Sequence, residues 1–306
     1  CADGRCAARQ HAARYLGRSG DLSRGGGAAA VAAPGSSGAP VDAVVIGGGL
    51  AGLSAALTLL DRGGSVVLLE KQGHLGGNSA WASSGVNAVD TNNTANGDSV
   101  AAFTADTMRG AQIENSSLIP VLTAGSVDSL AWMRDRLKEN LALDLVGQMG
   151  GHSFPRTHRP SSGLAGSAII FAIEKQLKKY LARDNGQLQL LKWTRATRLL
   201  TDEAGAVVGV EHVTVTPKDP DAAVASGRVM ARSVVIATGG FASDYTNSSL
   251  LRTHRPDLLK YATTNNKGTT GDGHKLALAA GAKAVDMDDV QVHPTGFHKP
   301  PHPPSY

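Results

Sequence analysis

Several residue types that define other protein classes are scarce in this chain of 306 residues. Cysteine occurs only at Cys1 and Cys6, so no disulfide framework and no cysteine-based metal site can support the rest of the chain. Aromatic residues make up 4%, which leaves few side chains for base stacking and argues against nucleic-acid binding. The formal net charge is +4, and residues 1–40 carry +3 of it with five arginines and two aspartates. The rest of the chain therefore has no strongly basic face.

Only one stretch of the sequence has the length of a membrane span, an uncharged run of 18 residues at positions 43–60. Within it, four glycines fall at residues 47–52, between a β-branched stretch and an Ala/Leu stretch. That order is typical of a strand, a tight turn and a helix. We therefore expect no membrane insertion.

Residues 1–40 differ in composition from the residues that follow, because they are rich in Ala, Gly and Arg and poor in acids. We expect a disordered leader or linker there. The scarcity of cysteine favours a reducing compartment. A soluble protein is expected, and the sequence leaves its location open between mitochondrion and cytoplasm.

Regular secondary structure is predicted from Val41 onward. Residues 41–46 are predicted to form a strand, residues 47–64 a turn and a helix, and residues 65–70 a second strand, which together make a βαβ unit. The remaining predictions are two helices within 98–140, the second started or kinked at Pro120, a helix at 166–183, strands through 187–238 with a hairpin turn at 203–205, a last helix near 273–280, and loops at 141–165.

The turn after the first predicted strand has the spacing G-x-G-x-x-G at Gly47, Gly49 and Gly52. Gly47 permits the tight turn, Gly49 lets the backbone approach a pyrophosphate, and Gly52 lets the helix lie close to the strand. Glu70 ends the second predicted strand, where a carboxylate accepts hydrogen bonds from ribose hydroxyls. These four residues predict a dinucleotide site, but they do not distinguish FAD from NAD.

Seven motifs follow one another along the chain: GGGLAG, LLEK, GGNSAWASSGVNA, GGHSFPRTHRP, VVIATGGF, TGDG and QVHPTGF. In this order they resemble the FAD-dependent oxidoreductase family of fumarate reductase and succinate dehydrogenase flavoproteins, most closely its soluble fumarate reductase branch. The resemblance spans about residues 41–297. It implies an α/β fold, with a doubly wound, Rossmann-like FAD-binding domain, a β-hairpin region and the start of a capping domain.

The resemblance also implies roles for individual residues. Asn78 stands where the membrane-complex branch has a histidine bonded covalently to FAD, which implies non-covalent FAD in this chain. The residues expected to bind FAD are Gly47, Gly49, Ala51, Gly52, Glu70, Lys71, Asn78, Ser79, Ser83, Ser84, Ala196, Gly239 and Asp272.

His293, in the QVHPT motif, is expected to bind the substrate, because the family uses this histidine for that purpose and imidazole can hold a carboxylate. Ser84 is the second expected substrate contact. The implied reaction is the reduction of fumarate, or a related unsaturated acid, to succinate by hydride transfer from N5 of FAD, with electrons from an unidentified donor. The family's proton-donating arginine lies downstream, beyond Tyr306. No residue of this chain is therefore assigned as catalytic, and we expect the chain alone to be inactive.

The sequence leaves other interpretations open. An aspartate oxidase, a urocanate reductase or a ketosteroid dehydrogenase of the same superfamily would share these motifs, as would a non-catalytic FAD-binding fragment. The His and Arg side chains of residues 152–159 either attract anions or brace a loop beside the flavin. No metal site is expected. The expected domains are a leader at 1–40, the FAD-binding domain at 41–290 and the start of the capping domain at 291–306.

Overall fold

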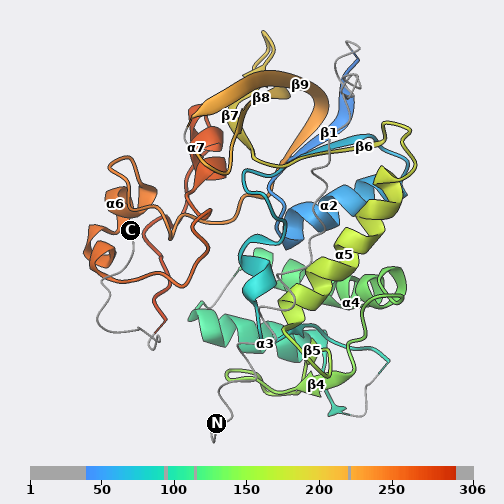
Figure 1. Ribbon diagram of the computed structural model, residues 1–306. Helices are drawn as coiled ribbons and strands as arrows, with labels where there is room; N and C mark the ends of the chain where they lie inside the picture. Colours follow the sequence, from blue (N-terminus) through green and yellow to red (C-terminus); the bar gives the residue numbers. More distant parts are fainter. Residues whose placement is uncertain (1–38, 93–95, 114–115, 220–221, 294–306) are drawn as a thin grey trace, which may run out of the picture. The chain divides into compact units, whose positions relative to one another are not determined.

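A mixed six-stranded sheet forms the centre of the computed structural model, which describes residues 39–92, 96–113, 116–219 and 222–293 (Figure 1). The strand order is β6-β2-β1-β9-β8-β7, in which β6, β2, β1 and β9 pair in parallel and β8 and β7 pair antiparallel. The parallel part has the order of a Rossmann half. The strands are β1 (Val41–Ile46), β2 (Val66–Leu69), β6 (Leu188–Leu191), β7 (Thr194–Thr201), β8 (Val207–Val215) and β9 (Ala223–Ile236).

The strand β1 is apolar along both faces because both faces are covered. Val45 packs into a core with helices α2 (Leu50–Asp61), α4 (Leu118–Arg136) and α5 (Ala165–Leu181). Val44 packs into a second core, formed with strands β7, β8 and β9 and with α7. The predicted α/β class and parallel sheet are confirmed. The face of β1 that carries Val44, however, is covered by strands β7, β8 and β9 and by α7 instead of a full layer of helices.

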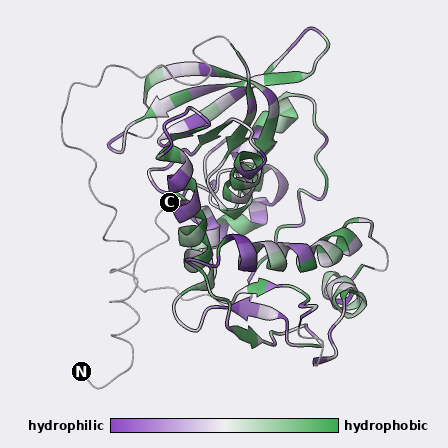
Figure 2. Cartoon of the chain, turned by 90° about the vertical axis from the view of Figure 1, so that its right-hand side faces the viewer, coloured by the Kyte–Doolittle hydropathy of each residue, from purple (hydrophilic) through white to green (hydrophobic). Residues whose placement is uncertain are grey.

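The helices show the pattern that this layering requires. Figure 2 shows hydrophobic and hydrophilic residues alternating along them, as in helices that cover a sheet with one face. In α5, Ile169, Ile173 and Leu177 recur at helical spacing and are all buried in the first core. The predicted helix at 166–183 therefore exists for the predicted reason.

A second, three-stranded sheet adds two short strands to residues 141–165, where the prediction of mainly loops otherwise holds. Its order is β3-β5-β4, with β3 at Val86–Asn87, β4 at Leu145–Gly147 and β5 at Thr157–Arg159. Strands of two or three residues carry too little alternation to be recognised in a sequence. Helix α3 (Val100–Ala111) and α4 lie between β3 and β4 in the chain, and Pro120 lies in the first turn of α4, where proline is tolerated.

The C-terminal part of the described chain contains α7 (Asp272–Ala279), close to its predicted position. Three further short elements were not predicted: the 3₁₀ turn η1 (Gly77–Trp81), helix α6 (Leu250–His254) and the 3₁₀ turn η3 (Pro256–Lys260). Among the described residues, no helix is both long and apolar enough to span a bilayer. The expected leader, apart from residues 39 and 40, and most of the expected capping segment lie outside the described residues, so the predicted domain limits stay predictions.

Candidate functional site

Two glycines of the turn between β1 and α2 lie where a side chain does not fit. Gly47 has a φ of +107°, and a Cβ there would lie 2.4 Å from the carbonyl oxygen of Ala237. A Cβ on Gly52 would lie 1.9 Å from the carbonyl oxygen of Gly47, so α2 can approach β1 only with glycine here. These two positions therefore bring the start of α2 against the end of β1.

Gly49 is different, because a Cβ on it would meet nothing closer than 3.8 Å. The space beside it is open, and the backbone there can be approached by a ligand. Gly49 also begins α2 and provides no side-chain cap. The N-terminus of α2 thus combines free backbone N–H groups with the positive end of the helix dipole, which suits a pyrophosphate.

Glu70 lies directly after β2 and is 9% exposed. Its Oε2 accepts the backbone N–H of Gly48 at 2.8 Å, and its Oε1 accepts the backbone N–H of Gln72 at 2.7 Å. Each oxygen has a second lone pair. The carboxylate is therefore held in one orientation and can still accept bonds from a ribose.

A cavity of about 500 Å³ lies over the glycine turn. Ten of the thirteen expected cofactor residues line it: Gly47, Gly49, Ala51, Glu70, Lys71, Asn78, Ser79, Ala196, Gly239 and Asp272. Gly52 lies behind the turn, where its role is packing. Ser83, Ser84 and His293 do not line this cavity and are exposed. The structure thus brings ten of the expected cofactor residues together around one cavity, but it does not bring Ser83, Ser84 or the expected substrate residue His293 to it.

Lys71 and Asp272 join the two walls of the cavity. The Nζ of Lys71 lies 2.9 Å from Oδ2 of Asp272 and 2.5 Å from Oγ1 of Thr270. Burial alone would raise the pKa of Asp272, but the charge of Lys71 and the hydroxyl of Thr270 outweigh it and lower that pKa below its usual value. Asp272 is therefore an ionised carboxylate in the first turn of α7, where a negative charge is favourable.

Asn78 faces the same second wall. Its Nδ2 donates to Oδ1 of Asn265 at 2.6 Å and to Oγ1 of Thr269 at 3.1 Å. Its Oδ1 accepts the backbone N–H of Asn266 at 2.6 Å. The side chain expected at the flavin is thus engaged with residues almost 190 positions further along the chain.

Sequence reasoning missed eight polar or charged residues of the cavity wall, four of which are Gln72, Asn266, Thr269 and His274. A signal was present, because Gln72 directly follows LLEK and the other three flank or follow TGDG. Single polar residues in loops, however, carry no spacing rule that separates them from ordinary loop residues.

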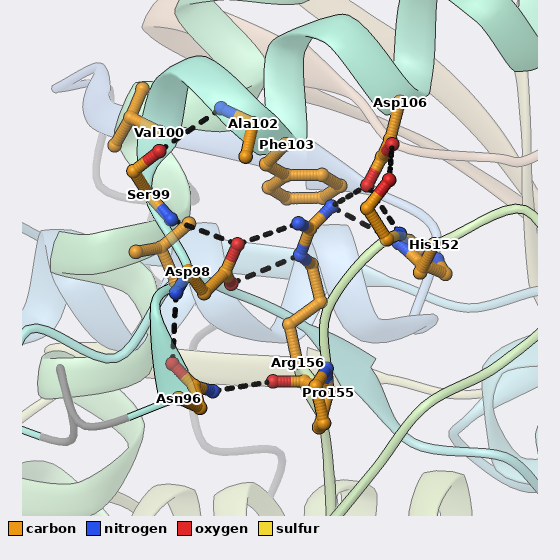
Figure 3. A network of polar contacts seen from close by, with 12 residues as sticks. Asn96, Asp98, Ser99, Val100, Ala102, Phe103, Asp106, His152, Pro155 and Arg156 are labelled. Atoms are coloured by element: carbon orange, nitrogen blue, oxygen red, sulfur yellow. Dashed lines mark hydrogen bonds and ion pairs between the residues drawn. The ribbon is translucent and has the colours of Figure 1, made fainter.

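Within the segment at 152–159, Arg156 forms a buried brace (Figure 3). Arg156 is buried and forms ion pairs with Asp98 at 2.6 Å and with Asp106 at 2.8 Å. Its guanidinium also stacks 4.6 Å from the ring centre of Phe103. His158 is fully buried, and burial lowers its pKa. Because Arg156 pairs with two buried carboxylates, its charge is not available to attract an anion.

Comparison with known proteins gives the same picture. The family model described as FAD binding domain matches residues 42–303. The chain is 40% identical over 267 residues to a fumarate reductase of Schizosaccharomyces pombe, covering 85% of this chain and 50% of that protein. It is 36% identical to fumarate reductase 1 of Saccharomyces cerevisiae, covering 84% of this chain and 53% of that protein. The chain thus spans about half the length of the curated relatives it matches.

A solved structure supports the same relationship. The open conformation of a flavocytochrome c3 fumarate reductase matches with a TM-score of 0.72 and 30% sequence identity, over 84% of this chain and 44% of that one. The residues present also fit the cofactor, because the cavity has an open backbone at Gly49 and an oriented acid at Glu70. The chain therefore belongs to the FAD binding domain family, and over this domain it is similar to fumarate reductases.

Proposed function

We propose that this chain is the FAD-binding part of an oxidoreductase that reduces fumarate, or a related unsaturated acid, to its saturated product. The observation that carries the proposal is the cavity itself, in which the glycine turn and Glu70 face Lys71 and Asp272. The names of the relatives supply the reaction class. Reduced FAD, when bound, supplies the hydride.

The chain's own residues bind and orient the cofactor. Glu70 would accept hydrogen bonds from the ribose hydroxyls, and the pyrophosphate would lie at the N-terminus of α2 beside Gly49. Ala196 and Gly239 line the cavity, and because their side chains are small or absent, a cofactor can pass close to the backbone. Asp272 provides a fixed acceptor on the opposite wall.

The attachment of FAD is proposed to be non-covalent. Asn78 has an amide at the position where the membrane-complex branch carries its covalent histidine, and an amide nitrogen of this kind is not a nucleophile toward flavin. Its hydrogen bonds to Asn265, Asn266 and Thr269 give the side chain a different task.

His293 is proposed as a donor to a substrate carboxylate. It is an exposed residue outside the cavity, at the end of the described chain. Its role therefore depends on a covering segment that excludes water from the reacting centre. No residue of the chain is assigned as the proton donor.

Two measurements test the proposal. Titration of the purified chain with FAD should quench flavin fluorescence to a one-to-one end point. A longer protein that contains this chain together with the capping domain should oxidise a reduced viologen dye with fumarate, whereas this chain alone should not. Faster turnover of urocanate or a ketosteroid than of fumarate, or oxidation of aspartate, would reassign the substrate while keeping the cofactor. FAD binding without turnover of any of these by the longer protein would favour a non-catalytic flavin-binding role.

A further inference from the structure

One wall of the cavity is a segment that side chains of the other wall hold in place. We call residues 265–270 the strap. Asn266, Gly268 and Thr269 of the strap line the cavity, and so do Gln72 and Asn78 on the opposite side. The strap lies between η3 and α7 and has no helix or strand of its own. Its position is therefore set by the bonds that tie it down.

The side chain of Asn78 is fully committed as a donor to the strap. Both of its Nδ2 hydrogens are used, one by Asn265 and one by Thr269, and its Oδ1 accepts from the backbone of Asn266. An amide group has only two N–H donors. Pyrophosphate oxygens can only accept, so Asn78 has no donor left for them. We therefore expect its effect on a bound pyrophosphate to pass through the strap.

Gln72 and Lys71 add to the same attachment. Nε2 of Gln72 donates to Oδ1 of Asn266 at 3.0 Å, and the same oxygen accepts the backbone N–H of Gly268 at 2.8 Å. Lys71 donates to Thr270 at the end of the strap. Each of these bonds between residues 71–78 and the strap uses at least one side chain.

The opposite side of the strap is attached differently. The carbonyl oxygen of Thr269 accepts the backbone N–H of Ser243 at 2.9 Å, and just past the strap the N–H of Gly271 donates to the carbonyl oxygen of Gly240 at 3.0 Å. These are backbone bonds to the turn after β9, and Oγ of Ser243 adds one side-chain bond to the carbonyl oxygen of Asn265 at 3.2 Å. The hydrogen bond between Asn78 and Asn265 is exposed to solvent. Water can therefore replace the side-chain bonds to residues 71–78 more easily than the backbone bonds on the opposite side.

We propose that the strap is a latch for FAD, closed by Asn78 and Gln72 as positioning residues and opened on the side of residues 71–78 when FAD enters or leaves. The inference rests on the proposed function, since it takes FAD as the ligand of the cavity. The rate of FAD release then follows the fraction of molecules with an open strap. Loss of one exposed hydrogen bond changes such an equilibrium by roughly two- to tenfold, and loss of the three bonds of Asn78 by about tenfold or more.

The first test measures the rate of FAD release from the loaded chain, with excess apoflavodoxin as a trap. Asn78→Ala and Asn265→Ala should both release FAD faster, Asn78→Ala by about tenfold. Asn265 does not line the cavity, so its effect cannot come from a lost FAD contact. Asn265→Asp keeps an acceptor for Asn78 and should stay near the parent rate. The exposed Asn185, whose side chain bonds only to Gln187, gives the matched control Asn185→Ala.

The combined variant separates a latch from two independent effects. If Asn78 and Asn265 act through their shared bond, Asn78→Ala with Asn265→Ala should release FAD about as fast as Asn78→Ala alone. If the fold-changes in the FAD release rate of the two single variants multiply in the double variant, the two residues act independently, and the coupling through the strap is overturned.

The second test reports on the strap without FAD. Lys267 is exposed within the strap and is followed by Gly268, so trypsin cuts there when the strap opens. Cleavage after Lys267 should accelerate by a factor similar to that of FAD release, while cleavage after the exposed Arg62 stays at the parent rate. Parent-like release and parent-like cleavage in both single variants would overturn the latch. A parent chain that binds no FAD would instead overturn the proposed function, and the latch for FAD with it.

Discussion

Glu70 accepts a hydrogen bond from the backbone N–H of Gly48 at 2.8 Å, so the acid that ends β2 also fixes the turn that follows β1. The bond to Gln72 makes the same carboxylate an anchor for the chain beyond β2. Sequence reasoning assigned Glu70 only to a ribose. In the structure this buried residue also holds two loops, and a substitution must affect both the site and its support.

We therefore expect Glu70→Ala to weaken FAD binding and to destabilise the fold. The backbone N–H groups of Gly48 and Gln72 would lose their acceptor, which costs about 1–3 kcal/mol of unfolding free energy. FAD affinity should fall by roughly ten- to a hundredfold. Urea unfolding and fluorescence titration measure the two effects. Glu203→Ala, in an exposed turn, is the control, and parent-like FAD affinity in Glu70→Ala would remove Glu70 from the ribose.

A second prediction concerns the attachment of the cofactor. Acid precipitation of the FAD-loaded protein should release all of the flavin into the supernatant, because Asn78 offers no nucleophile for a covalent bond. Absorbance of the washed pellet near 450 nm measures the remainder. Flavin that stays with the pellet would contradict the non-covalent assignment.

The buried brace of Figure 3 predicts a large loss of stability when its arginine is removed. Arg156→Met leaves the buried carboxylates of Asp98 and Asp106 without their shared partner, which costs about 3–5 kcal/mol. The exposed pair of Arg198 and Glu211 offers the control, since Arg198→Met should change the unfolding free energy far less than Arg156→Met does. Equal losses in the two variants, measured by urea unfolding, would show that the brace is not the stabilising feature.

The same brace makes stability depend on pH. Burial alone would raise the pKa of Asp106, but hydrogen bonds from Ser153 and the guanidinium groups of Arg109 and Arg156 hold it well below the usual 3.8. A lowered folded pKa stabilises the protein above the unfolded pKa, and this contribution is lost as pH falls through the folded value. The difference in unfolding free energy between the parent and Asp106→Asn should thus be full at pH 7 and shrink below about pH 4. A difference that stays constant down to pH 2 would contradict this assignment.

The sequence predicts the first βαβ unit and its glycines well because that information is local. Gly47 and Gly52 follow from the spacing of the turn, and the structure shows the clash that each would suffer as alanine. The partners of Asn78 were not predictable in the same way, because Asn265 and Asn266 lie in a loop whose position depends on the completed fold. The β-hairpin region was predicted, but its place over the second sheet face was not, since that place depends on the pairing of β8 with β9.

The placement of β1 has a consequence for synthesis of the chain on the ribosome. β1 pairs on one side with β2, which follows it closely, and on the other side with β9, where Val41 lies opposite Ala231. While the nascent chain is shorter than this, one edge of an apolar strand stays open, and open strand edges favour aggregation. Pairing across such a sequence distance also slows folding. The edge is closed only when Ile236, the last residue of β9, has left the ribosome. The wall of the cavity that contains the strap and Asp272 is synthesised later still.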